Sequence, residues 1–119
     1  MATSVFERYG GFATVSKVVL SFYDKMLDSP LTSPYLDGID MKRLIDHQTK
    51  FIATIMGGPA SYTNEHLDHV HARLRISEEA FDEAMLMLRE TLEDHDMEEA
   101  DIRIVEDEMI SRKKYVVRN

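Results

Sequence analysis

The fold is decided by residues 40–58, which read DMKRLIDHQTKFIATIMGG. This stretch predicts one amphipathic helix, because residues spaced by three and four positions share a single helix face. That face carries Met41, Leu44, Ile45, Gln48, Phe51, Ile52 and Ile55. Asp40 is suited to cap the start of the helix, and the following run Gly57-Gly58-Pro59 is suited to end it.

One position on this apolar face is polar. Gln48 lies near its centre, where a buried amide without a partner costs about 1–3 kcal/mol, so we expect some group to meet it. His47 lies at the edge of the same face, one turn from Leu44 and from Phe51. In the ordinary interpretation, Gln48 bonds a neighbouring backbone group and His47 faces water.

Helical spacing recurs on both sides of this stretch. We expect a short helix over residues 5–9, closed by Gly10-Gly11, and a helix from about Thr14 whose buried face holds Val15, Val18, Val19, Phe22, Met26 and Leu27. Residues 31–38 read as a connection with a short helical turn, anchored by Tyr35 and Leu36.

A long helix is expected after Ser77, and its buried face holds Phe81, Ala84, Met85, Leu88 and Leu92. A last helix starts near Met97 and packs through Ile102, Val105, Met109 and Ile110, while His95 is exposed in the preceding turn. No convincing strand is found, so we predict an all-α fold.

A second polar residue sits on an apolar face within residues 64–74. Leu67, Val70, His71 and Leu74 share that face, although His66 borders it on the other flank and the spacing barely separates the two histidines. His69 points the other way, which argues against a zinc site made of three histidines. A lone histidine on such a face is most often a core residue with a partner, and the residues alone leave this explanation open.

The composition limits the classes of partner. The chain has 119 residues, a formal net charge of −8 and no cysteine, so it offers no thiolate ligands and repels phosphate backbones and anionic membranes. The N-terminus lacks the basic and apolar regions of a signal peptide, and no run approaches the roughly 18 apolar residues of a membrane span. We expect a cytoplasmic protein with one domain, residues 1–119, and neither nucleic-acid nor membrane partners.

Several short motifs together resemble the group I truncated haemoglobins, most closely those of the cyanobacterial type. The motifs are Tyr9-Gly10-Gly11, Phe22-Tyr23, the run from Met41 through Gln48 with Phe51, Gly57-Gly58-Pro59, and Val70-His71 followed by Ile76 and Phe81. They follow the order and spacing of that family from about residue 5 to residue 110. The resemblance implies a shortened globin, a two-over-two helical sandwich that encloses haem b, with His71 as the proximal iron ligand.

The resemblance also implies roles for other residues. Tyr23 and Gln48 match the family's distal polar pair, which donates to a bound gas, and Leu44 matches the distal gate. His47 matches a position that in some relatives provides a second iron ligand when no gas is bound; contact with a haem propionate is the alternative. The residues implied to line the haem are Phe22, Leu36, Leu44, Phe51, Ile55, Leu67, Val70, Ile76, Phe81 and Met85.

Two positions depart from the family pattern. Leu36, next to Tyr35, stands where the family usually has a loop phenylalanine that packs on the haem. Some relatives attach the haem covalently through a histidine in the last helix, but this chain has no histidine after His95. We therefore expect the haem to be held without a covalent bond.

The function implied by the resemblance is binding of O2, NO and CO by a monomer, with dioxygenation of NO to nitrate as the implied reaction. Turnover would need a reductase, and no residue names one, so enzyme status stays open. A haem-based redox or gas sensor, or an electron-transfer protein acting through a partner, is the second hypothesis. A cofactor-free helical interaction module, with Gln48 and His71 as ordinary core residues, is the third.

Overall fold

The fold is known from a computed structural model that describes residues 4–58 and 76–117. The helices in these ranges are α1 (Val5–Arg8), α2 (Phe12–Asp28), the 3-10 turn η1 (Ser33–Leu36), α3 (Met41–Ile55), α5 (Glu78–Asp94), α6 (Glu99–Ser111) and α7 (Lys113–Val116). Pairing between extended segments is limited, in these ranges, to one isolated parallel bridge between Ile76 and Val117. The predicted all-α class is confirmed.

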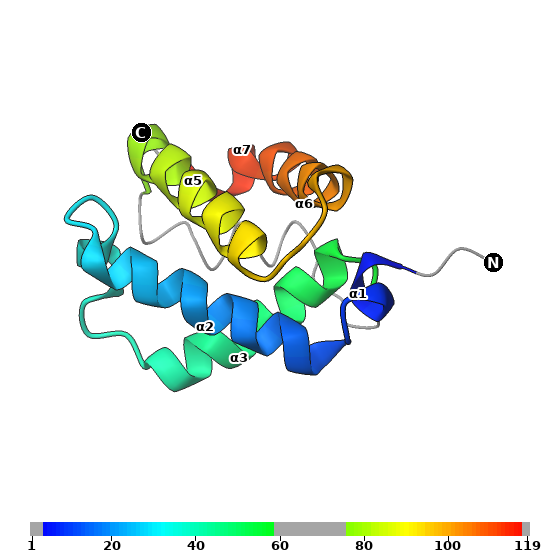
Figure 1. The fold of residues 1–119 in the computed structure, drawn as a ribbon. Helices are drawn as coiled ribbons and strands as arrows, with labels where there is room; N and C mark the ends of the chain where they lie inside the picture. Colours follow the sequence, from blue (N-terminus) through cyan, green and yellow to red (C-terminus); the bar gives the residue numbers. More distant parts are fainter. Residues whose placement is uncertain (1–3, 59–75, 118–119) are drawn as a thin grey trace.

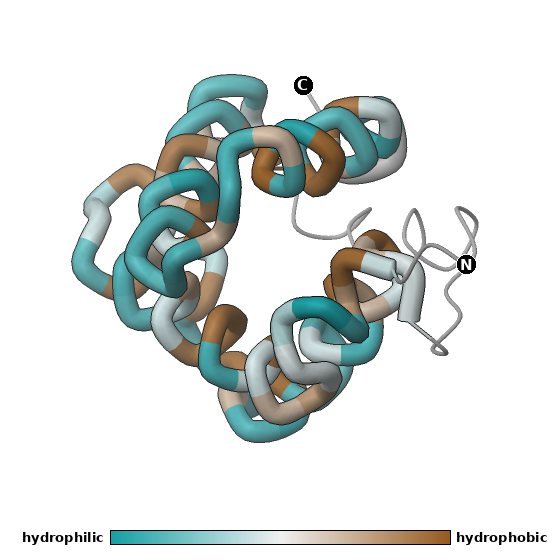
Figure 2. Tube along the Cα trace, turned by 45° about the vertical axis from the view of Figure 1, so that its right-hand side comes forward, coloured by the Kyte–Doolittle hydropathy of each residue, from teal (hydrophilic) through white to brown (hydrophobic). Residues whose placement is uncertain are grey.

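The long helices form two pairs, α2 with α3 and α5 with α6 (Figure 1). Contacts between α2 and α5 join the two pairs. In Figure 2 the pairs surround the middle of the molecule, and several hydrophobic stretches of the trace border it. This arrangement is the expected two-over-two sandwich of helices.

The apolar faces of these helices meet in one core. Val15, Val18 and Val19 of α2 are at most 1% exposed, because their spacing of three and four places them on one side of the helix. From the other helices, the core takes Phe51, Ile52, Ile55, Leu88, Leu92, Ile102 and Val105. Burying each such side chain stabilises the fold by about 1.5–3 kcal/mol.

The helix ends form largely as the sequence predicts. The Asp40 carboxylate accepts a hydrogen bond from the Arg43 backbone N–H at 3.2 Å, and the Ser77 hydroxyl accepts one from Ala80 N–H at 3.1 Å. At the end of α3, Gly57 has a φ of +87°, which favours glycine, and Gly58 N–H donates to the Ala53 carbonyl at 2.7 Å. These caps fix where α3 and α5 begin and where α3 ends.

Some expectations about which side chains are buried were wrong. Leu27 is 45% exposed and Ile110 is 55% exposed, whereas we expected both to pack inward. In each case the preceding methionine, Met26 or Met109, packs on the core, and neighbours on a helix point about 100° apart. His95 is half-buried rather than exposed, with its Nδ1 2.9 Å from the Thr91 carbonyl oxygen.

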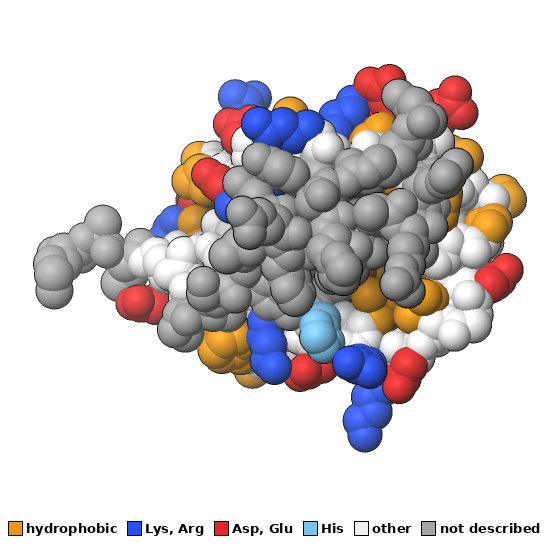
Figure 3. Space-filling view, turned by 180° about the vertical axis from the view of Figure 1, so that it is seen from behind, with side chains coloured by type: hydrophobic (Ala, Val, Ile, Leu, Met, Phe, Trp, Pro, Cys, Tyr) orange, Lys and Arg blue, Asp and Glu red, His pale blue; other side chains and the backbone are white. Residues whose placement is uncertain are grey.

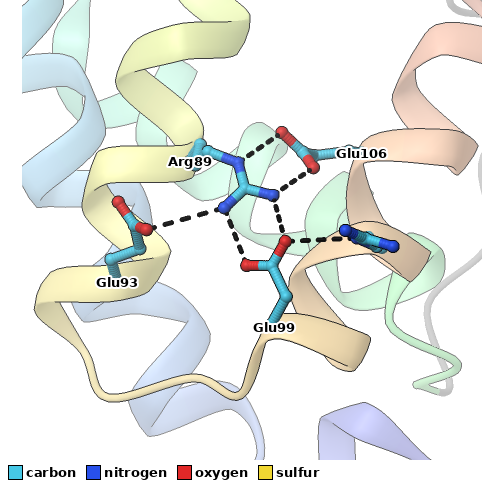
Figure 4. Close-up of polar contacts among 5 residues, drawn as sticks. Arg89, Glu93, Glu99 and Glu106 are labelled. Atoms are coloured by element: carbon cyan, nitrogen blue, oxygen red, sulfur yellow. Dashed lines mark hydrogen bonds and ion pairs between the residues drawn. The ribbon is translucent and has the colours of Figure 1, made fainter.

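Arg89 joins α5 to α6. Its guanidinium donates to both carboxylate oxygens of Glu99, at 2.9 and 2.7 Å, and to both of Glu106, at 3.1 Å each (Figure 4). Hydrogen bonds from Arg89 lower the pKa of Glu99 to about 2, so this carboxylate stays charged well into the acid range. The network holds the α5–α6 pair in register across its polar side.

None of the helices within residues 4–58 and 76–117 is long and apolar enough to cross a membrane. Figure 3 shows the molecule from behind, where hydrophobic side chains reach the surface beside the residues drawn in grey. Some hydrophobic side chains of the described residues are therefore exposed on this face.

Candidate functional site

A pocket lies between α2, α3 and α5, with η1 at one side. The cavity has a volume of about 130 Å³, and the space between its walls reaches about 920 Å³ when the open solvent at its mouth is counted. Among the described residues, its lining consists of Phe22, Tyr23, Met26, Thr32, Tyr35, Leu36, Ile39, Leu44, Gln48, Phe51, Ile76, Ala80, Phe81, Ala84, Met85, Leu88 and Met109. None of these carries a formal charge, and most are apolar.

Helical spacing explains how each wall of the pocket is built. On α3 the lining residues Leu44, Gln48 and Phe51 are four and three positions apart, so one face of the helix presents all three. On α5 the same spacing relates Ala80 to Ala84 and Ala84 to Leu88. The apolar faces of α3 and α5 thus contribute both to the pocket and to the hydrophobic core.

Tyr23 lies at the edge of the α2 face and is 7% exposed. Its ring meets the Phe22 ring edge to face, with centroids 5.2 Å apart. Burial raises the pKa of Tyr23 above its ordinary value, so the phenol keeps its proton across the physiological range. A protonated phenol can donate a hydrogen bond.

Two polar side chains of the lining have no hydrogen-bond partner in the part of the chain that the structure describes. Within residues 4–58 and 76–117, neither the Tyr23 hydroxyl nor the Gln48 amide makes a hydrogen bond. The other two are occupied: the Thr32 hydroxyl donates to the Met26 carbonyl at 2.7 Å, and the Tyr35 hydroxyl accepts from Ser77 N–H at 3.2 Å. Both groups are accessible from the pocket, since no fully buried side-chain nitrogen or oxygen of the described residues lacks a partner, so Tyr23 and Gln48 can donate hydrogen bonds to a ligand that accepts them.

The structure places nine of the implied haem-lining or ligand-binding residues around this one pocket. They are Phe22, Tyr23, Leu36, Leu44, Gln48, Phe51, Ile76, Phe81 and Met85. Ile55 is 6% exposed and packs in the core, and it is not part of the lining. Leu67, Val70 and His71 lie outside the described residues.

His47 lies half-buried on α3, and it is not among the pocket residues. It is one position before Gln48, so its side chain leaves the helix about 100° away from that of Gln48. Within the described ranges, no group of three His, Asp or Glu side chains is arranged to hold a metal ion.

Sequence reasoning assigned no site role to several residues of the lining. Met26 was predicted to be buried and lies one turn beyond Phe22, so the helical spacing could have included it. Ala84 and Leu88 were likewise predicted on a buried face. Tyr35 and Met109 come from a loop and from a distant helix, and no local spacing connects them to Gln48.

Comparisons with known proteins agree with this arrangement. The family model described as bacterial-like globin matches residues 4–118. A group 1 truncated hemoglobin of Mycolicibacterium paratuberculosis is 35% identical over 68 residues, which is 57% of this chain and 50% of that protein. A group 1 truncated hemoglobin of Tetrahymena thermophila is 28% identical over 91 residues, 76% of this chain and 75% of that protein. This chain therefore matches half the length of the mycobacterial relative.

Solved structures of low sequence identity share the fold. The truncated hemoglobin from Tetrahymena pyriformis in its Fe(III) form has a TM-score of 0.89 and 22% identity, covering 98% of this chain and 100% of that chain. A 2/2 hemoglobin of a Synechococcus species with covalently attached heme has a TM-score of 0.89 and 23% identity, covering 97% and 98%. These likenesses show that the helices are arranged as in those proteins.

Proposed function

This chain belongs to the bacterial-like globin family, as a truncated haemoglobin, and on that premise we propose that it binds haem b and, through the haem iron, diatomic gases such as O2, NO and CO. One observation carries the proposal: an apolar pocket open to solvent contains two polar side chains, Tyr23 and Gln48, that have no hydrogen-bond partner among the described residues.

The residues of the pocket suit a flat, mostly apolar macrocycle. Aromatic rings from three helices line it, namely Phe22, Phe51 and Phe81, and no charged side chain of the described residues is buried in it. By the family resemblance His71 would hold the iron, which neutral imidazole suits, and its second ring nitrogen would then donate to a carbonyl or carboxylate. With no histidine after His95, we propose that the haem is held without a covalent bond.

Haem supplies an iron atom that binds a diatomic gas and shifts electron density onto it. Tyr23 and Gln48 would donate hydrogen bonds to the ligand as it acquires negative charge. Such bonds contribute more than neutral ones, and they are stronger in a pocket from which water is excluded. Leu44, one turn before Gln48, would limit access of the gas to this end of the pocket.

We also propose NO dioxygenation as the reaction of this site, written NO + O2 + e⁻ → NO3⁻. The electron must come from a reductase, so the protein alone would complete one turnover and then stop. Tyr23 and Gln48 would orient the O2 that reacts with NO. Consumption of NO by the loaded protein, one equivalent without a reductant and many with one, tests this reaction separately from gas binding.

Replacing His71 tests the haem assignment. His71→Ala should abolish or greatly weaken haem retention, because it removes the proposed iron ligand. His66→Ala and His69→Ala are matched controls, since they delete an imidazole from the same segment, and both should retain haem. The absorbance of haem per purified chain is the readout. A His71→Ala protein with the haem content and spectrum of the wild type would refute this assignment.

A further inference from the structure

Tyr35 connects the two sides of the pocket. It lies on η1, lines the pocket and is half-buried. Its hydroxyl accepts a hydrogen bond at 3.2 Å from the backbone N–H of Ser77, the residue that caps the start of α5. The contact joins residues 42 positions apart in the chain. One end of it belongs to the loop that follows α2, and the other begins the helix that carries Phe81 and Met85.

The start of the same loop is held by other bonds. Ser29 Oγ donates to the Glu83 carboxylate on α5 at 3.2 Å, and Thr32 Oγ1 donates to the Met26 carbonyl. Both residues are at most 7% exposed. Farther along, within the described ranges, the Tyr35–Ser77 bond is the one hydrogen bond between η1 and the beginning of α5. The start of the loop is therefore held by Ser29 and Thr32, and its hydrogen bond to the beginning of α5, beside the pocket, comes from Tyr35.

The bond also satisfies a donor that a helix cannot satisfy itself. The first N–H groups of an α-helix have no partner within the helix. Ser77 Oγ accepts from Ala80 N–H, and Tyr35 accepts from Ser77 N–H, so the entry into α5 has two of its donors paired. Ile76, the preceding residue, lines the pocket and pairs with Val117. Residues 76 and 77 are thus held from two directions.

We propose that the Tyr35–Ser77 hydrogen bond is a latch that keeps η1 closed on the start of α5 and thereby slows the release of haem, an inference that rests on the proposed function. Tyr35 and Ile76, the residue before Ser77, both line the pocket, so a motion that widens this side of the pocket separates η1 from α5 and breaks this bond. Tyr35 is a positioning residue, because it acts through the closure of the pocket.

Tyr9 offers a matched control. Its hydroxyl accepts a hydrogen bond from Glu98 N–H at 3.1 Å, and Glu98 is the N-cap of α6. It also donates to the Asp101 carboxylate at 2.7 Å. Tyr9→Phe therefore deletes the same kind of bond, in which the backbone N–H of a helix N-cap donates to a tyrosine hydroxyl, at a place that is not part of the pocket.

The experiment measures haem transfer from the loaded protein to an excess of apomyoglobin. Tyr35→Phe should release haem about 3- to 10-fold faster than the wild type, the size expected for one neutral hydrogen bond. Tyr9→Phe should leave the release rate within about twofold, although it lowers stability toward urea at least as much because it breaks two bonds. Unchanged release from Tyr35→Phe, or equal acceleration by Tyr9→Phe, would overturn the latch.

A second readout follows the bond itself. Hydrogen exchange of the Ser77 amide in the loaded protein should become faster in Tyr35→Phe and stay unchanged in Tyr9→Phe, because only the first change removes its acceptor. Equal protection of Ser77 in all three proteins would contradict the proposed contact. A wild-type protein that takes up no haem at all would instead refute the proposed function, so the two failures are distinguishable.

Discussion

Tyr23 and Gln48 are the residues on which ligand binding depends in our account. Each should donate a hydrogen bond to bound O2, and bonds to a charged partner contribute roughly 1.5–3 kcal/mol. Tyr23→Phe and Gln48→Leu should therefore each raise the O2 dissociation rate by about 10- to 100-fold, measured by stopped-flow displacement. The two effects should not simply add, because both donors serve one ligand.

Thr32→Val is the control for these substitutions. Thr32 also lines the pocket, but its hydroxyl donates to the Met26 carbonyl and is not available to a ligand. The change should lower stability and leave the O2 dissociation rate nearly unaltered. If Tyr23→Phe and Gln48→Leu stay within about twofold of the wild type, as Thr32→Val should, the distal assignment fails.

His47 tests a different property of the haem iron. We propose that it binds the iron when no gas is present, although it lies off the pocket lining and α3 would have to turn or shift to bring it there. The ferrous, gas-free protein should then show sharp low-spin bands near neutral pH, and His47→Leu should convert them to a broad high-spin spectrum. A wild-type spectrum that is already high-spin would assign His47 to a haem propionate or to the surface.

Local spacing accounts for some of these residues and not for others. Gln48 stands out in the sequence because a helix of period 3.6 puts it on an apolar face, and the structure places it in the pocket. Tyr23 needed the resemblance, since its position beside Phe22 is otherwise that of a core aromatic. The Tyr35–Ser77 bond could not be predicted, because it joins a loop hydroxyl to a backbone donor 42 residues away.

Among the secondary-structure elements, α1 is held to α6 through one carboxylate. Asp101 is 4% exposed; it accepts hydrogen bonds from the Arg8 guanidinium and from the Tyr9 hydroxyl. The hydrogen bond from Arg8 is the main cause that lowers the pKa of Asp101 below its ordinary value, and the hydrogen bond from Tyr9 adds to the effect. The charged form of Asp101 thus joins the first helix of the described chain to α6.

Asp101→Asn should reveal this joint as a pH-dependent loss of stability. Because the folded pKa lies below the ordinary value of about 3.9, the contribution is present above that pH and is lost as the pH falls through the folded pKa. Near neutral pH, Asp101→Asn should lower the free energy of unfolding by about 1–2 kcal/mol, since Arg8 is partly exposed and its bond is screened by water. The difference from wild type in urea unfolding should shrink below about pH 4. A difference that stays constant from pH 6 to pH 3 would argue against this role.

The helix boundaries show what the sequence can predict at this scale. Asp40 and Ser77 cap α3 and α5 as expected, because their side chains reach N–H groups that the helix leaves unpaired. The last long helix was expected to begin near Met97 and begins two residues later, at Glu99, because Glu98 is in an extended conformation as the N-cap and Met97 is buried before it. Apolar spacing does not distinguish a buried turn residue from the first residue of a helix.

For the whole molecule, haem binding and stability are linked. A ligand that binds only the folded state stabilises it, by about 4 kcal/mol when the free ligand is 1,000 times its dissociation constant. The haem-loaded protein should therefore melt at a markedly higher temperature than the haem-free protein, as followed by circular dichroism. Equal melting temperatures would mean that haem binds the unfolded chain as tightly as the folded one, which would contradict a site that exists only in the folded pocket.

The class of the whole fold followed from periodicity alone, whereas the pairing of its helices did not. Apolar positions at intervals of three and four predict helices, but they do not state which helix packs on which. The resemblance implied only a two-over-two arrangement, and the observed pairs, α2 with α3 and α5 with α6, agree with it. Met109 illustrates the gap, because it reaches the pocket from α6 only once the helices are assembled.

The apolar pocket of this chain is proposed to bind one haem. Titration of the haem-free wild-type protein with hemin, followed by its absorption spectrum, tests this most directly. If the pocket binds one haem, a sharp Soret band should grow linearly and saturate at one hemin per chain. A spectrum that remains that of free hemin at every ratio would contradict the claim and leave Gln48 and Tyr23 as ordinary residues of a helical protein without a cofactor.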